Sequence, residues 1–273
     1  MKARKIGFPP KIGVVIPTLF DREAYLHQCI DSVRRSGSVH ILLMGPSQPN
    51  AKPFIGKVDQ FLEEPISKTL SSKIDVALKS LPSEVEFFTW IGDDDLLEAE
   101  SMTLASRALI EHKDLVMVFG SCRYIDANGE SIGMNKSGQW ALTVMKFGPF
   151  LAPQPGSLYR RESYNSVQGL NSDLELAFDY DLTYKLASQG RVLYLHKVLA
   201  SYRWHPGALS VNLRRESASE AASVRLEHCE SWARPLIRVI NPLLVLMTVF
   251  AGVLTSALTM RRKARAAKKI NAS

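Results

Sequence analysis

Cysteine is scarce in this 273-residue sequence, and the three cysteines present argue against two kinds of protein. Cys29, Cys122 and Cys229 are too widely spaced for a disulfide framework or for a zinc site built from paired Cys and His ligands. A secretory signal is also lacking, because the basic segment 1–5 is followed by Ile, Gly, Phe, two prolines and a strand-like segment instead of an apolar run. We therefore expect a reducing compartment, with the amino-terminal body in the cytosol.

The sequence also lacks a glycine-rich phosphate-binding loop. The first predicted strand ends at Pro17 and Thr18, and neither a Gly-x-Gly-x-x-Gly nor a Walker pattern follows it. This absence argues against a dinucleotide-binding dehydrogenase and against a P-loop enzyme. Any bound phosphate must then be held by another device, such as a metal ion assisted by Lys73, Arg203 or His205.

Acidic residues are missing from the carboxyl-terminal segment, where eight Lys and Arg residues occur from Arg234 onward. Without these eight, the formal net charge of +7 becomes −1 for residues 1–233, so a nucleic-acid partner is not expected. The cations flank Val239–Met260, a run of 22 residues with no ionisable side chain. At about 1.5 Å per residue this run is long enough to cross the roughly 30 Å core of a bilayer, and its basic flanks favour an anionic membrane surface.

Apolar, β-rich runs alternate with helical patterns in the first half of the chain. The strand-like runs cover 12–16, 39–44, 85–91 and 115–119, and the helical patterns cover 21–35, 69–81 and 98–112. This alternation predicts an α/β fold with a Rossmann-like, mostly parallel sheet and helices on both faces. An Asn-Gly hairpin at 124–132, a helix at 174–189 and a strand at 192–200 then predict a mixed second half.

Three adjacent carboxylates, Asp93, Asp94 and Asp95, follow the apolar run 85–91. Because like charges repel, such a cluster at the carboxyl end of a buried strand requires a cationic counterpart. Hard oxygen ligands suit Mg²⁺ or Mn²⁺, which also bind phosphate. The alternative is that Asp95 only caps the following helix, while the other two acids lie solvated in the turn.

In their order and spacing, several motifs resemble the inverting glycosyltransferases of family two, which have the GT-A fold and use nucleotide sugars. The resemblance runs from about residue 12 to residue 210 and includes a segment similar to the family's DXD element. Its landmarks are Val14–Thr18, Ile91–Asp95, Pro153–Arg161, the helical Asp179–Leu182 and Tyr202–His205.

The resemblance implies binding roles for the matching residues. They divide into a nucleotide pocket and a metal-diphosphate site. Pro17, Thr18 and Lys73 would line the nucleotide pocket, Asp93 would contact the nucleoside and Asp95 the metal-diphosphate. Side-chain chemistry adds His205 as a candidate metal ligand and Arg203 as a candidate contact of the donor.

Asp179 falls where the family has its catalytic carboxylate. Inverting transfer requires a general base that deprotonates the acceptor hydroxyl on the face opposite the departing nucleotide diphosphate. Asp181 lies two residues further along the same predicted helix and therefore on a different face. It remains the alternative base.

The carboxyl-terminal run raises a question of topology. Nucleotide sugars are cytosolic and the positive-inside rule keeps Arg261–Lys269 inside, so a single span does not satisfy both conditions. A re-entrant or in-plane helix satisfies both, and Pro242 offers a bend near its start. A stripe of small, weakly polar residues also suits contact between helices, so a homo-oligomer through this helix is a further expectation. The alternative is a buried amphipathic helix of a soluble protein.

The sequence therefore predicts a GT-A domain at 1–233, with a nucleotide-binding half at about 11–120 and an acceptor half at about 121–233. A membrane-associated helix with a basic tail follows at 234–273. The expected reaction is inverting, metal-assisted transfer of a sugar from a nucleotide-diphosphate donor, with a UDP-sugar expected, to a hydroxyl of a lipid-linked or cell-surface glycan at the cytoplasmic face of the inner membrane. Two alternatives stay open: a metal-dependent nucleotidyltransferase, and a non-catalytic, membrane-tethered module that binds glycans or nucleotides.

Overall fold

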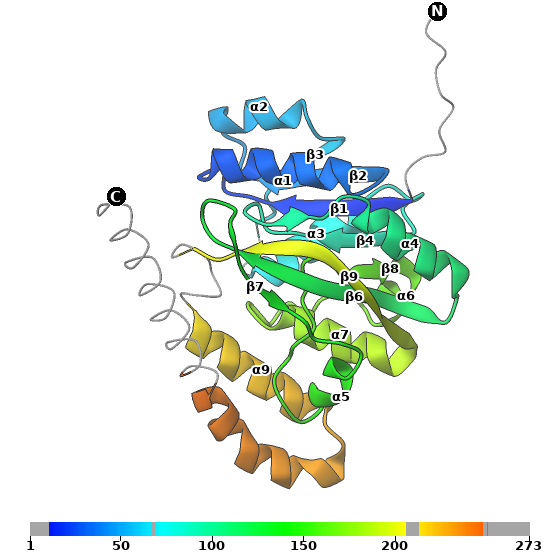
Figure 1. The fold of residues 1–273 in the computed structure, drawn as a ribbon, viewed down its shortest axis with the longest axis vertical. Coiled ribbons are helices and arrows are strands. Elements are labelled where there is room, and N and C mark those ends of the chain that lie inside the picture. The colour runs from blue at the N-terminus through cyan, green and yellow to red at the C-terminus, as the bar shows by residue number, and fades with distance from the viewer. Residues whose placement is uncertain (1–10, 67–68, 206–212, 248–249, 251–273) are drawn as a thin grey trace, which may run out of the picture.

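The computed structural model describes residues 11–66, 69–205, 213–247 and 250. Within these residues the chain forms a nine-stranded sheet in the order β3-β2-β1-β4-β8-β6-β9-β5, with β7 paired to β6 (Figure 1). The strands are β1 (Ile12–Pro17), β2 (Val39–Gly45), β3 (Gln60–Glu63), β4 (Phe87–Trp90), β5 (Leu96–Leu97), β6 (Leu115–Ile125), β7 (Ser131–Asn135), β8 (Leu158–Arg160) and β9 (Arg191–Arg203).

Helices cover both faces of the sheet, as the sequence predicts. The side chains of α1 and α4 share one hydrophobic core with one face of β1 and β2, while those of α3, α6 and α7 share a second core with the other face. The helices are α1 (Glu23–Arg35), α2 (Lys52–Ile55), α3 (Leu70–Lys79), α4 (Ser101–Glu111), α5 (Ala141–Val144), α6 (Arg161–Ser166), α7 (Phe178–Gln189) and α9 (Arg214–His228).

The first half of the sheet is parallel. β1 lies between β2 and β4 and is parallel to both, and β3 extends this arrangement beyond β2. Burial on both faces explains why these strands are continuously apolar in sequence instead of alternating. All of them therefore end at the same edge of the sheet, where the ligands of open α/β sheets bind.

The second half is mixed, which confirms the predicted change after residue 119. β8 lies antiparallel between β4 and β6, whereas β6 and β9 run parallel. The predicted Asn-Gly turn joins β6 to β7, with Gly129 at a φ of 88° and a hydrogen bond of 2.9 Å from the Asp126 N–H to the Glu130 carbonyl. Glycine reaches this conformation without the strain that a Cβ atom brings.

The helix predicted at 174–189 begins later, at Phe178. The reason is a contact that the sequence does not reveal: the Glu220 carboxylate, on α9, accepts hydrogen bonds from the backbone N–H groups of residues 175–177. These residues therefore precede α7 and do not form its first turn, and their backbone N–H groups are satisfied by the Glu220 side chain.

Beyond α9 the described chain ends in a further helix at residues 234–247. Figure 1 shows α9 and this helix at the opposite end of the molecule from β3 and α2. Much of the predicted apolar run 239–260 lies outside the described residues. Among those that are described, no helix has both the length and the apolar character needed to cross a membrane.

Candidate active site

The carboxyl ends of β1 and β4 meet at the predicted nucleotide turn. Pro17 closes β1, and the backbone N–H of Thr18 donates to the Met44 carbonyl at the end of β2, at 2.8 Å. The Thr18 hydroxyl donates a 2.6 Å hydrogen bond to Oδ2 of Asp93, which follows β4. The structure therefore brings together two predicted site residues that are 75 positions apart in the sequence.

The acidic triplet lies in the loop that follows β4. Asp93 and Asp95 are buried, at 3% and 4% exposure. Gly92 leaves room for this arrangement, because a Cβ atom at this position would lie 2.8 Å from the Asp94 carboxylate. Asp95 does not cap the next helix, since α4 begins only at Ser101 and Oδ1 of Asp95 accepts from the backbone N–H of Arg203 at 2.8 Å. The capping alternative is therefore wrong.

Two basic side chains contact the carboxylate groups of the triplet. The Arg22 guanidinium lies 3.1 Å from Oδ1 of Asp93 and 2.6 Å from Oδ2 of Asp94. Nε2 of His205 lies 2.8 Å from the same Asp94 oxygen, which places the predicted metal ligand beside the triplet. Asp94 thus links Arg22 to His205.

Burial and mutual repulsion disfavour the ionised forms of this triplet. Burial raises the pKa of Asp93 to about 6, although the Thr18 hydrogen bond and the Arg22 charge oppose the rise. Burial and the neighbouring Asp94 charge raise the pKa of Asp95 well above its usual value. A divalent cation would reverse both shifts by favouring the charged carboxylates.

The donor chemistry of the triplet fits a divalent metal. Asp93 and Asp95 supply buried carboxylate oxygens, which suit Mn²⁺ or Mg²⁺, and His205, beside Asp94, adds an imidazole nitrogen. No cluster of three or more metal-ligating side chains is assembled for a metal within the part of the chain that the structure describes. The match between the triplet and a divalent metal therefore rests on the residue types, on their burial and on the raised pKa values of Asp93 and Asp95.

Arg203, expected to contact the donor, has a different place in the structure. Its side chain is buried at 1% exposure, with Nε donating to the Asp94 carbonyl and Nη2 to Oε1 of Gln28. Its guanidinium also lies over the Tyr25 ring, 4.3 Å from the ring centroid. Because its donors are occupied by the protein beneath the acidic loop, Arg203 supports this loop and presents no free cation to a phosphate.

Lys73, expected near the nucleotide, projects from α3 and pairs with Glu64 at 2.6 Å. Glu64 directly follows β3, and its backbone N–H donates to the Gly45 carbonyl at the end of β2. The pair thus lies at the same sheet edge as Thr18. The role of Lys73 at the nucleotide stays a prediction. Glu64 is an acid at this edge that was not predicted from the sequence.

The two carboxylates of α7 differ sharply in their surroundings. Asp181 is buried at 1% exposure and contacts His228 at 2.7 Å and Lys185 at 2.8 Å. Burial alone would raise the pKa of Asp181, but these two partners outweigh it and hold the pKa below its usual value. The neighbouring His228 and Lys185 thus stabilise the ionised form of Asp181.

Asp179 has no cationic partner among the described residues. The Tyr180 backbone N–H donates to Oδ1 of Asp179 at 2.8 Å, and burial raises the pKa of this half-buried carboxyl to about 6. A carboxylate of this kind is a stronger base than an ordinary aspartate and remains ionised at neutral pH.

Aromatic side chains join Asp179 to the acidic loop. Phe178, the residue before Asp179, packs against Trp90 of β4 with ring centroids 5.9 Å apart. Trp90 also stacks on Tyr159 of β8, and its carbonyl accepts from the Gln154 side chain at 2.8 Å. The amino end of α7 is thereby fixed beside the strand that leads into the triplet.

The fold has solved counterparts, although the sequence itself matches little. No protein-family model and no curated protein matches the chain. S. aureus TarS 1–349 in complex with UDP-GlcNAc is 17% identical, with a TM-score of 0.58 over 84% of this chain and 70% of that chain. The mannosyltransferase PcManGT from Pyrobaculum calidifontis, in complex with GDP-Man and Mn²⁺, is 13% identical, with a TM-score of 0.59 over 92% of this chain and 76% of that chain. The chain thus has the GT-A fold of these solved structures.

Proposed function

We propose that this protein is an inverting glycosyltransferase that transfers a sugar from a nucleotide-diphosphate donor to an acceptor hydroxyl. The contrast between Asp179 and Asp181 carries the proposal. One carboxylate of α7 is neutralised by His228 and Lys185, whereas Asp179 has a raised pKa of about 6 and no cationic partner among the described residues. Asp179 suits the general base, which takes the proton from the acceptor hydroxyl as that oxygen attacks the sugar.

The donor end of the site lies at the carboxyl ends of β1, β2 and β4. The proposal is supported by the shared fold with proteins solved in complex with UDP-GlcNAc and with GDP-Man. Pro17, Thr18 and Asp93 line the nucleotide pocket, with Lys73 and Glu64 at the same sheet edge. The first donor to test is a UDP-sugar.

A divalent metal would be held by Asp95, with His205 beside it. The proposal draws support from the raised pKa of Asp95 and from the Mn²⁺ present with the mannosyltransferase. The metal would stabilise the charge that builds on the departing nucleotide diphosphate. The chain's own residues orient the donor through Thr18 and remove the acceptor proton through Asp179.

The acceptor that we propose is a lipid-linked or cell-surface glycan precursor, used at the cytoplasmic face of the membrane. The support comes from the sequence, in which eight cations and no acids flank or follow the apolar run from Val239. An acceptor anchored in lipid would be confined to the same surface as the enzyme.

The function is tested by incubating the full chain with UDP-, GDP- and dTDP-sugars, with and without Mn²⁺, and identifying the products. Release of the nucleoside diphosphate with one donor class supports sugar transfer. In a parallel incubation with a nucleoside triphosphate and a sugar 1-phosphate, release of pyrophosphate would instead show a nucleotidyltransferase. Saturable donor binding with no product after long incubation with acceptor would show a binding module.

A further inference from the structure

The helix at residues 234–247 is packed against the protein along one face. Ala233, Ile237 and Asn241 recur every four residues and are buried. Asn241 ties the helix to α9 twice, because its Oδ1 accepts from Nε of Arg225 at 2.9 Å and its Nδ2 donates to the Ala222 carbonyl at 2.8 Å. This face is therefore an internal contact of the protein.

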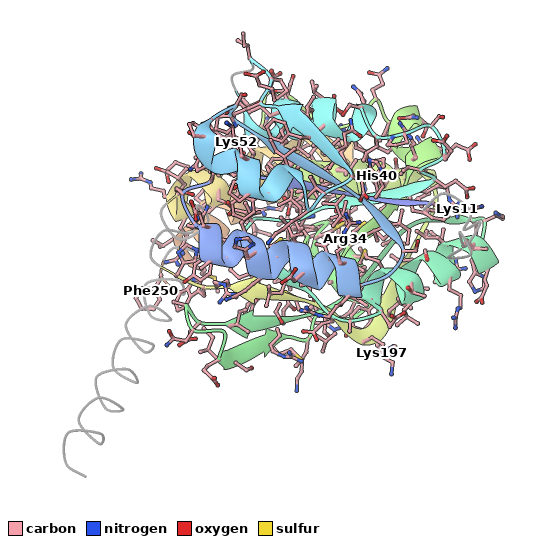
Figure 2. The ribbon with its side chains drawn as sticks, turned by 90° about the horizontal axis from the view of Figure 1, so that it is seen from above. Lys11, Arg34, His40, Lys52, Lys197 and Phe250 are labelled. Atoms are coloured by element: carbon pink, nitrogen blue, oxygen red, sulfur yellow. The ribbon has the colours of Figure 1, made fainter. Side chains whose placement is uncertain are left out.

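The opposite face is apolar and exposed. Large apolar side chains recur there at spacings of three and four residues, which places them on one side of a helix. The members, here named the apolar stripe, are Trp232, Leu236, Val239, Leu243, Leu246, Met247 and Phe250. Val239 is 76% exposed and Leu246 66% exposed, so the part of the chain that the structure describes leaves this surface uncovered. Figure 2 shows Phe250 at the periphery of the molecule, on the opposite side from Lys11.

Charge identifies the kind of surface that would cover the stripe. Arg234 and Arg238 are exposed on the same helix, and no Asp or Glu occurs after Glu230. The sequence adds six more Lys and Arg residues between positions 261 and 269. An apolar helix face with cations and no acids complements the headgroups and acyl chains of an anionic bilayer.

We propose that the apolar stripe inserts into the surface of an anionic bilayer, with the helix lying in the membrane plane. A spanning arrangement does not fit residues 233–241, because a spanning helix is surrounded by lipid or by other helices, whereas Ile237 and Asn241 are packed on the protein body. The stripe begins at Trp232, seven residues before the uncharged run in the sequence, and tryptophan favours the membrane–water interface.

The stripe continues toward the acceptor half of the fold. The Trp232 ring lies 6.3 Å from the ring of Phe147, which is 40% exposed. A pocket of about 240 Å³ opens between Phe147, Trp232 and the carboxyl-terminal part of α7. Insertion of the stripe would therefore bring this part of the protein to the lipid surface.

The test is co-sedimentation of the full chain with vesicles of phosphatidylcholine alone or mixed with phosphatidylglycerol. The wild-type chain should bind the anionic vesicles and stay bound in high salt. The double variant Val239→Asp/Leu243→Asp should lower the vesicle partition coefficient by about tenfold or more, because charge on the inserted face opposes burial in the bilayer. The control Ile110→Asp changes an exposed apolar residue of α4 and should bind as the wild type does.

Three results would overturn the proposal: equal binding of the double variant, complete release of the wild type by salt alone, or a wild-type dimer that the double variant abolishes without vesicle binding. The inference is independent of the chemistry of the site. Hydrolysis of a soluble nucleotide sugar should be the same for the double variant and the wild type, so a failure of lipid binding is distinguishable from a failure of the proposed function.

Discussion

The carboxylate of Glu220 accepts a 2.9 Å hydrogen bond from the backbone N–H of Ala177, the residue immediately before α7. The N–H groups of Glu175 and Leu176 donate to the same carboxylate. Glu220 thus caps the amino end of one helix from the middle of another, and its charge complements the helix dipole. Because Asp179 lies in the first turn of α7, Glu220 is a positioning residue for the proposed base.

Replacing Glu220 by Ala should lower kcat about tenfold while leaving the KM for the donor unchanged. The cap would be lost and the orientation of Asp179 relaxed, at a stability cost of about 1 kcal/mol. Steady-state kinetics and a thermal melt measure the two effects. Glu220→Gln keeps a side-chain acceptor, so it should recover most of the rate. A fall in donor affinity with kcat intact would contradict the positioning role.

Asp179→Asn should make the protein more stable at neutral pH. The folded-state pKa of about 6 lies above the ordinary value, so the folded protein keeps a proton that the unfolded chain releases from about pH 4 upward. Stability from this group is therefore lost as the pH rises through 6, and ionised Asp179 costs about 3 kcal/mol at pH 7. Melting temperatures of both proteins at pH 5 and pH 7 measure this. A variant that gains no stability at the higher pH would refute the raised pKa.

Asp181→Asn, in contrast to Asp179→Asn, should make the protein less stable. It removes the charge that pairs with His228 and Lys185 and leaves these bases without a buried partner. The expected loss is about 3 kcal/mol of unfolding free energy, while the turnover of the folded fraction stays near that of the wild type. Denaturant titration and active-site-normalised kinetics measure the two quantities. Loss of turnover in a stably folded variant would instead make Asp181 the base.

The metal assignment predicts that Asp95→Asn weakens Mn²⁺ binding by about tenfold or more, since a neutral amide replaces an anionic ligand. Isothermal titration calorimetry on the wild type and the variant provides the comparison. Asp114→Asn, which removes an exposed acid paired with Arg191, serves as the control and should bind Mn²⁺ normally. Identical titrations for wild type and Asp95→Asn would move the metal elsewhere.

Much of the fold could be predicted because its signals are local. Continuous apolar runs mark strands buried on both faces, and β1, β2 and β4 lie where these runs predict them. The Asn-Gly turn before β7 is equally local. By contrast, α9 was not predicted, because few of its residues are buried and its sequence is mostly polar.

Residues of the candidate site could be predicted from the sequence only where the residue type itself indicates the chemistry. Asp93, Asp95 and Asp179 could be selected from the sequence because they are acids in motifs that occur in the expected order along the chain. Arg22 and Glu220 could not, since their roles arise from contacts 72 and 43 positions apart along the chain. Arg203 was assigned to the donor for its charge, but its guanidinium donates to the Asp94 carbonyl beneath the acidic loop, and only the tertiary structure shows this.

The most direct test of the account compares wild type with Asp179→Asn for both donor binding and donor turnover. The wild type should release a nucleoside diphosphate from its donor in the presence of Mn²⁺ and an acceptor. The variant should bind the donor with unchanged affinity and turn over at least about 100-fold more slowly, as expected when a general base is removed. Wild-type turnover by Asp179→Asn would contradict the account.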